Sequence, residues 1–203
     1  MEKIVLILDY GMGNIFSVKN ALEYLGAKVK ISSNSSQISN YEYIILPGVG
    51  SFGKAMEKIK YLKIDLGIKD AVKKKNKILG ICLGFQLLCN SSSEGGSEEG
   101  LGLIDDDIIK MDNNFGKVPH VGFNSIKVKS NNDLFYGVKD GSDFYFNHSY
   151  FLKNNNQKFV TSTCMNNNDF VSSYCKDNIY GTQFHPEKSQ SNGLIILKNF
   201  LNK

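Results

Sequence analysis

The feature that most constrains the fold is the alternation of apolar runs and helix-like patterns in the first half of the chain. Residues 4–8 form a continuous apolar run, as expected for a parallel strand that is covered on both faces. A turn at 10–13 leads into a helical pattern that Asn14 is placed to cap, and Gly26 closes it. Apolar runs at 27–31, 42–46 and 77–81 follow, and a helical region of about 52–75 precedes the last of them. This alternation predicts a parallel sheet with helices on both faces.

The second half is dominated by short strand-like runs. They lie at residues 124–129, 143–147, 158–164, 170–175 and 179–184. Asn-rich turns at 154–156 and 166–168 suit hairpins between them. A final helix is expected from about residue 191, with Leu194, Leu197 and Leu201 spaced as one buried stripe. We therefore expect an α/β fold with a central, mostly parallel sheet and a smaller antiparallel portion in the C-terminal half. At 203 residues, we expect a single domain that spans 1–203.

Composition argues against several classes of protein. The net charge of +4 comes from Lys alone, whereas nucleic-acid binders usually show Arg forks and a clustered basic face. The dense Lys run at 73–77 is interpreted as a solvated helix end. No apolar run approaches the ~20 residues that span a bilayer, and the apolar N-terminal run is too short for a secretory signal. Four cysteines without a CxxC pair and only three histidines predict no metal site and a reduced, cytoplasmic protein.

A cysteine stands at a predicted strand-to-helix junction, within Gly80-Ile81-Cys82-Leu83-Gly84. An apolar strand enters this segment and a helical pattern at 85–88 leaves it. Small flanking residues let the backbone turn sharply, so that the nucleophile is presented in a strained conformation. The following helix N-terminus favours a thiolate and supplies backbone N–H donors. By itself the pattern also suits a buried structural cysteine, but its place at the junction favours a nucleophile.

A matching base and acid occur near the C-terminus. A nucleophilic cysteine needs a base, and the base needs an orienting acid. His185 and Glu187 are two residues apart at the end of a predicted strand, so their side chains can leave on the same side. Pro186 between them stiffens the backbone. The sequence therefore predicts a triad of Cys82, His185 and Glu187.

Glycines follow two other predicted strands. Pro47-Gly48-Val49-Gly50 ends a strand and can present free backbone N–H groups to an oxyanion, although the same residues also suit an ordinary loop. Gly11-Met12-Gly13 has no third glycine at the required spacing, because Phe16 stands there. A dinucleotide fingerprint is therefore not supported.

Together these segments resemble the class I (triad) glutamine amidotransferase family, and within it the glutaminase subunits of imidazole glycerol phosphate synthase. The resemblance covers nearly the whole chain. It is carried by residues 9–14, 47–53, 80–88, 100–104, 118–124, 145–150 and 183–189. The segments Pro-His-x-Gly-x-Asn at 119–124 and His-Ser-Tyr at 148–150 single out the subfamily.

The resemblance implies roles for the matching residues. Cys82 would attack the side-chain amide of glutamine, and His185, oriented by Glu187, would protonate the departing ammonia and then activate water. The implied oxyanion and substrate-binding residues are Gly50, Leu83, Gln86, Glu94, Ser149 and Tyr150. Glu94 would hold the α-ammonium, and the backbone around Ser149 and Tyr150 would hold the α-carboxylate. The family implies no cofactor.

The resemblance also implies a partner. It is a (β/α)8-barrel cyclase subunit that forms a heterodimer with the glutaminase and receives its ammonia. The cyclase makes imidazole glycerol phosphate and aminoimidazole carboxamide ribotide in histidine biosynthesis. The implied contact residues are His120, Phe123, Asn124, Tyr145 and Lys188.

Two residues depart from the family pattern, and other functions stay open. Phe123 replaces a tryptophan and loses its indole N–H donor, and Asn147 replaces an apolar residue. His148 suits a structural role as well as a functional one, and Cys89, about two helical turns after Cys82, suits a small core residue.

The alternatives are a glutaminase that serves anthranilate, aminodeoxychorismate or pyridoxal phosphate synthesis, a triad hydrolase of related fold, and a catalytically silent docking protein.

Overall fold

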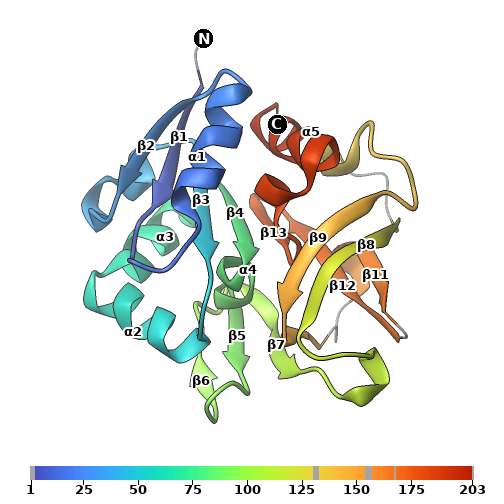
Figure 1. Ribbon diagram of the computed structural model, residues 1–203. Coiled ribbons are helices and arrows are strands. Elements are labelled where there is room, and N and C mark those ends of the chain that lie inside the picture. The colour runs from blue at the N-terminus through green and yellow to red at the C-terminus, as the bar shows by residue number, and fades with distance from the viewer. Residues whose placement is uncertain (1–2, 130–132, 154–156, 167, 203) are drawn as a thin grey trace.

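Five parallel strands form one half of the central sheet in the computed structural model (Figure 1), which describes residues 3–129, 133–153, 157–166 and 168–202. Their order is β2 (Lys28–Ser32), β1 (Ile4–Leu8), β3 (Tyr43–Gly48), β4 (Lys77–Cys82) and β13 (Ile179–Thr182). The last of them comes from near the C-terminus and lies beside β4. The carboxyl ends of β4 and β13 therefore meet at one edge of the sheet, where ligands usually bind in folds of this kind.

Four antiparallel strands continue the same sheet beyond β13. Their order is β12 (Asn168–Lys176), β11 (Val160–Asn166), β8 (His120–Val128) and β9 (Asp143–His148). The sheet is thus parallel from β2 to β13, with β13 as the one strand from the second half of the chain in that part, and antiparallel from β13 to β9. This arrangement confirms the predicted fold class.

Each face of the sheet carries its own apolar core. α1 (Ile15–Tyr24) and α5 (Gln190–Leu201) contribute buried side chains to one core, and α2 (Phe52–Tyr61) and α3 (Ile64–Lys73) contribute to the other. Along β1, Val5 and Ile7 belong to the first core, whereas Leu6 and Leu8 belong to the second. Burial on both faces explains why this strand is a continuous apolar run.

A second, four-stranded sheet was not predicted. Its order is β10 (Tyr150–Leu152), β7 (Ile104–Lys110), β5 (Cys89–Ser92) and β6 (Glu98–Glu99). β5 and β6 are short and polar, β7 contains three Asp residues and β10 has only three residues, so each carries a weak strand signal. The expectation that Cys89 lies two helical turns after Cys82 is wrong, because α4 (Leu83–Leu87) is short and Cys89 begins β5.

Several predicted boundaries also change. The helical region of about 52–75 is two helices, and Lys63 between them adopts a left-handed φ of 57°. In α5, Ile196, Leu197, Phe200 and Leu201 are buried, whereas Leu194 is only half-buried. Short 3-10 helices complete the fold: η1 (Ser35–Asn40), η2 (Asn113–Phe115), η3 (Asp133–Phe135), η4 (Gln157–Phe159) and η5 (Pro186–Lys188). The predicted turn at 154–156 and Asn167 of the second Asn-rich turn lie outside the described residues.

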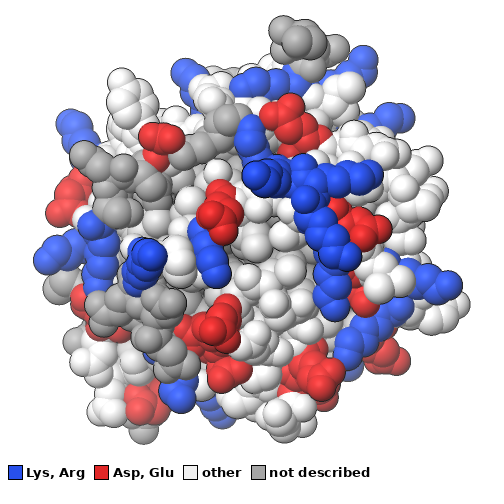
Figure 2. Space-filling model, turned by 180° about the vertical axis from the view of Figure 1, so that it is seen from behind, with Lys and Arg blue, Asp and Glu red and all other residues white. Residues whose placement is uncertain are grey.

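The surface carries mixed charge. On the face shown in Figure 2, Asp and Glu side chains lie among the Lys side chains over most of the area. Within the described part of the chain, the helices are all too short or too polar to cross a bilayer.

Candidate active site

Cys82 occupies a strained turn between β4 and α4. Its φ of 54° and ψ of −111° lie outside the regions that non-glycine residues usually adopt. Cys82 is only 5% exposed. The turn is possible because α4 approaches β3 closely at Gly84, where a Cβ atom would lie 1.8 Å from the carbonyl oxygen of Leu46. A strained backbone conformation costs free energy, and its presence in the folded protein is typical of a functional turn.

The turn is followed by a weaker helix than we expected. α4 has only five residues, so its dipole is small and contributes little to stabilising a thiolate. The sulfur instead contacts one backbone carbonyl and one side-chain amide. Sγ of Cys82 lies 3.7 Å from the carbonyl oxygen of Asn147, and Nε2 of Gln183 donates to Sγ across 3.8 Å.

His185 and Glu187 form a buried pair beside Cys82. Nδ1 of His185 lies 2.9 Å from Oε1 of Glu187, and their side chains are 2% and 1% exposed. The backbone N–H of His185 donates to the carbonyl of Tyr145 at 2.9 Å, and the Ser189 hydroxyl donates to the carbonyl of His185 at 2.6 Å. These bonds hold the segment that carries both side chains.

The charge state of His185 follows from its neighbours. Burial lowers the pKa of His185, but the proximity of Cys82 and the hydrogen bond and charge of Glu187 outweigh burial and raise the pKa to about 10. Nε2 is buried without a partner in hydrogen-bond geometry among the described residues. The ring therefore holds a proton at neutral pH and lies close enough to Cys82 to interact with it.

This raised pKa predicts a pH dependence of stability. A group whose pKa rises from 6.5 to about 10 on folding stabilises the native state fully below pH 6.5, and the contribution is lost as pH rises through 10. Glu187→Gln removes the acceptor charge, so its free energy of unfolding should fall less steeply between these pH values than that of the wild type. Denaturant unfolding of both proteins across this range measures the difference. Parallel curves would contradict the assigned charge of His185.

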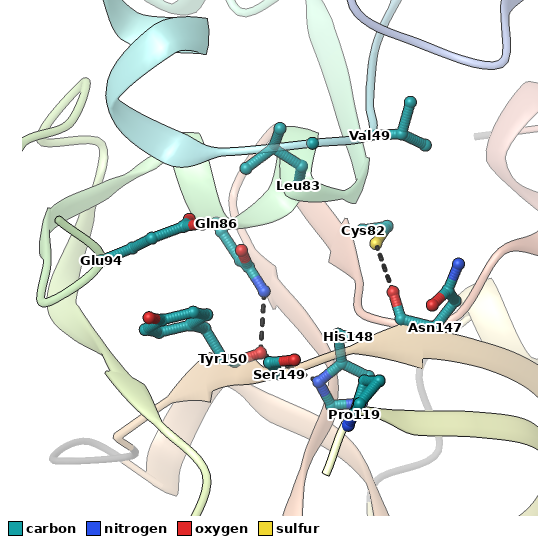
Figure 3. Close-up of a pocket in the computed structure, with 11 residues that line it drawn as sticks. Val49, Cys82, Leu83, Gln86, Glu94, Pro119, Asn147, His148, Ser149 and Tyr150 are labelled. Atoms are coloured by element: carbon teal, nitrogen blue, oxygen red, sulfur yellow. Dashed lines mark hydrogen bonds between the residues drawn. The ribbon is translucent and has the colours of Figure 1, made fainter.

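A cavity of about 240 Å³ opens over Cys82 (Figure 3). All six predicted oxyanion and substrate-binding residues line it: Gly50, Leu83, Gln86, Glu94, Ser149 and Tyr150. Val49, Pro119, Asn147 and His148 complete the wall. The volume is below the roughly 300–1,000 Å³ of sites for drug-sized ligands, so the cavity suits a small metabolite.

The polar groups of the cavity are held by specific bonds. Nε2 of Gln86 donates to the carbonyl of Tyr150 at 2.8 Å and to Oε1 of Gln183 at 3.0 Å. Oε2 of Glu94 accepts from the backbone N–H of Phe52 at 2.8 Å, which places its carboxylate at the start of α2. Gly50 adopts a φ of 105° in the loop that precedes this helix, a conformation that glycine tolerates.

The predicted partner residues fall into two groups. Phe123, which is 47% exposed, and Tyr145 are cross-strand neighbours with ring centroids 5.5 Å apart, and Nζ of Lys188 lies 5.5 Å from the Tyr145 centroid. We call these three residues the aromatic cluster. Asn124 is half-buried beside it. His120 is only 4% exposed and its ring bonds to Asn124 and His148, which weighs against a direct contact with a partner.

Sequence reasoning missed two polar residues of the site. Gln183 directly follows β13 and lies two residues before His185, a spacing that could have indicated it, because the strand predicted at 179–184 would turn both side chains to one side. Asn14 stands at the N-cap position of α1 but makes no capping bond. Its Nδ2 lies instead 3.4 Å from Oε1 of Glu187, so it is a second donor to the acid.

Comparison with known proteins identifies the family of this chain. The profile of the glutamine amidotransferase class-I family matches residues 6–203. The chain belongs to the class-I glutamine amidotransferase family. It is a glutamine amidotransferase enzyme subunit, and its described residues include no group of three or more His, Cys, Asp or Glu side chains that could hold a metal ion.

This amidotransferase is similar in sequence to curated subunits of imidazole glycerol phosphate synthase. It is 42% identical over 194 residues to imidazole glycerol phosphate synthase subunit HisH of Caldanaerobacter subterraneus subsp. tengcongensis, covering 96% of this chain and 95% of that one. It is 43% identical over 201 residues to the subunit HisH of Pyrococcus furiosus, covering 98% of each chain. The resemblance found in the sequence is thereby confirmed.

A solved structure supports the fold of this amidotransferase. The structure of PurLQS from Thermotoga maritima superposes with a TM-score of 0.76 at 19% identity, covering 100% of this chain and 99% of that one. At this identity the likeness supports the fold alone.

Proposed function

We propose that this amidotransferase hydrolyses glutamine with the triad Cys82, His185 and Glu187 and passes the ammonia to a cyclase subunit. The observation that carries the proposal is the strained cysteine beside a buried His–Glu pair, at the wall of a cavity lined by polar groups. A base held at one ring nitrogen by an acid leaves its other nitrogen available to the nucleophile.

The reaction has two halves. His185 holds the proton of Cys82, so Sγ attacks as a thiolate and forms a bond to the side-chain carbonyl carbon of glutamine. The C–N bond breaks while His185 gives that proton to the nitrogen, so that ammonia leaves. In the second half His185 takes a proton from water, the hydroxide attacks the thioester, and glutamate departs as Cys82 is regenerated. Backbone N–H groups of Leu83 and Gly50 would stabilise the oxyanion of both tetrahedral intermediates.

The cavity suits a zwitterionic amino acid. The Glu94 carboxylate can pair with the α-ammonium, and backbone groups around Ser149 and Tyr150 can hold the α-carboxylate. Gln86 can accept a hydrogen bond from the substrate, because both hydrogens on its Nε2 are already donated. Nucleophile, base and acid are all side chains, so the reaction requires no cofactor.

The aromatic cluster supports a docking surface for the partner. Exposed aromatic rings with a neighbouring cation are typical anchors of a protein interface. The HisH relatives are named as subunits of imidazole glycerol phosphate synthase. We infer that the partner is a (β/α)8-barrel cyclase that forms a heterodimer with this chain and receives ammonia directly, in histidine biosynthesis. The four free cysteines, one of them the proposed nucleophile, suit a reducing cytoplasm.

The test is glutamate release from glutamine, measured for the purified chain alone and then with the cyclase and its ribonucleotide ligand. We expect strong stimulation by the cyclase and its ligand together. High activity that does not respond to the cyclase would keep the triad but assign another synthase as the partner. No glutamate release in any mixture would favour a docking protein without catalysis.

A pair of variants separates docking from chemistry in the same assay. Phe123→Ala should weaken cyclase binding by roughly 10-fold or more, because it removes an interface anchor. Tyr136→Ala removes another exposed ring, directly after η3, which packs against α5, and should leave cyclase binding unchanged. Equal binding by both variants would exclude the aromatic cluster from the interface.

A further inference from the structure

Two histidine side chains link the half-buried Asn124 to the wall of the cavity. Nδ2 of Asn124 lies 2.6 Å from Nε2 of His120, and Nδ1 of His120 lies 3.0 Å from Nε2 of His148. Nδ1 of His148 lies 2.9 Å from the carbonyl oxygen of Tyr150. His120 and His148 are register partners on β8 and β9, so the sheet itself sets their spacing. The result is an unbroken chain of hydrogen bonds, which we call the histidine relay.

The direction of every bond in the histidine relay can be deduced. A carbonyl oxygen only accepts, so Nδ1 of His148 carries a hydrogen. If His148 is neutral, its Nε2 is an acceptor, and Nδ1 of His120 must be the donor. Nε2 of His120 is then an acceptor as well, and the amide nitrogen of Asn124 donates to it. Each group thus has one role, and the chain points from Asn124 toward Tyr150.

The surroundings keep both rings neutral. Aromatic rings enclose them: the centroid of Phe170 lies 5.4 Å from that of His120 and 5.0 Å from that of His148, and Phe146 lies 4.9 Å and 5.9 Å away. Burial lowers the pKa of His148 to about 3 and also lowers that of His120. The two imidazoles therefore carry no charge at neutral pH, which satisfies the condition for the deduced direction.

The histidine relay ends on the group that orients Gln86. The carbonyl of Tyr150 accepts from His148 and also from Nε2 of Gln86, so both lone pairs of this oxygen are occupied. Nε2 of Gln86 gives its second hydrogen to Gln183, which leaves only Oε1 of Gln86 for a ligand. Gln86 and Tyr150 both line the cavity, and a dashed line in Figure 3 marks the hydrogen bond between them.

We propose that His120 and His148 are neutral positioning residues that, through the carbonyl of Tyr150, hold the Gln86 amide with its oxygen toward the substrate. This inference rests on the proposed function, because it assigns the oxygen a donor on glutamine. Neither histidine touches the reacting atoms. The neutral form is required because an imidazolium at His148 would present a hydrogen to His120 and break the direction of the relay.

The ring tautomers give a direct test that needs no catalysis. The chain has three histidines, so NMR of the ring nitrogens in a protein made with isotope-labelled histidine yields three sets of signals, assigned by single substitutions. At neutral pH we expect His120 and His148 to carry hydrogen on Nδ1 alone and His185 to carry it on both nitrogens. A hydrogen on Nε2 of His148 would overturn the proposal.

Substrate binding gives the second test, measured by titration of glutamine into the complex in a Cys82→Ser background. Adding His148→Leu removes the donor to Tyr150 and should weaken glutamine binding about 10-fold, the usual effect of losing a buried hydrogen bond. Adding His148→Asn retains a donor near the position of Nδ1 and should restore most of the affinity. A matched control, Phe170→Leu, trims a ring against both histidines without removing a hydrogen bond, and should lower stability while affinity is unchanged.

The outcomes separate the two proposals. Glutamine binding in the background protein that is unchanged by His148→Leu would overturn the positioning role and leave the proposed function intact. Equal weakening by His148→Leu, His148→Asn and Phe170→Leu would also overturn it, because the effect would follow packing and not the donor. Absence of glutamine binding in the background protein, in an otherwise folded complex, would overturn the proposed function and this inference together.

Discussion

Cys82→Ala should abolish glutamine-dependent synthesis by the complex of this chain with its cyclase, while synthesis from free ammonia continues at the wild-type rate. The loss should be about a thousandfold or more, because removing the nucleophile of a triad leaves only the contributions of binding and the oxyanion site. Ammonia supplied in solution bypasses the thioester, so the cyclase reaction itself needs no thiol. Both rates are measured on one preparation with either nitrogen source.

Another cysteine supplies the control for this experiment. Cys89 is buried like Cys82 and also has a free thiol, but it does not line the cavity, and its Sγ lies 3.8 Å from the carbonyl of Phe85. Cys89→Ala should keep both activities and cost only a little stability. If Cys82→Ala loses both activities equally, Cys82 has a structural role. If it loses neither, the nucleophile is another residue.

The second large effect is expected from a single methyl group at Gly84. A Cβ atom built there lies 1.8 Å from the carbonyl oxygen of Leu46, and backbone atoms cannot move aside as a flexible side chain can. Gly84→Ala must therefore push α4 away from β3 and displace the turn that carries Cys82. We expect a loss of roughly 4 kcal/mol or more in the free energy of unfolding, or failure to fold. Denaturant unfolding and glutamate release together measure it.

Gly53 provides a matched control, because it is the second residue of α2 as Gly84 is the second residue of α4. The nearest atoms to a Cβ at Gly53 belong to the flexible Glu98 side chain, the closest at 3.2 Å. Gly53→Ala should be neutral or should stabilise the protein by up to about 1 kcal/mol, as alanine usually does in a helix. A Gly84→Ala protein as stable as Gly53→Ala would show that the close approach of α4 to β3 is not required.

The parallel half of the fold could be predicted because its signals are local. The strand at 4–8 agrees with β1, and the run at 77–81 agrees with β4 to within one residue. Continuous apolar runs of this kind follow from burial on both faces, a requirement that each strand carries in its own residues. The junction at Cys82 and the spacing of His185 and Glu187 are local patterns too, and both were found where they were predicted to lie along the chain.

The rest depends on contacts between distant parts of the chain. The second sheet joins strands that are short, as β5, β6 and β10 are, or rich in Asp, as β7 is. Their register is set by their partners, so none of them could be recognised from its own residues. Asn14 shows the same limit: its residue type and position indicated a helix cap, whereas the fold turns its amide to Glu187, 173 residues away. His120 matched a segment associated with partner contact, but the pairing of β8 with β9 buries it against His148.

The sequence by itself determined the alternating architecture, the family and the three residues proposed for catalysis, because each is encoded in a short run of neighbouring residues. Only the tertiary structure decided what surrounds them. The contact of Cys82 with Asn147 spans 65 residues, and that of Gln86 with Gln183 spans 97. Such pairs leave no periodic trace in the sequence, since the direction of a hydrogen bond depends on which distant group the folded backbone brings within reach.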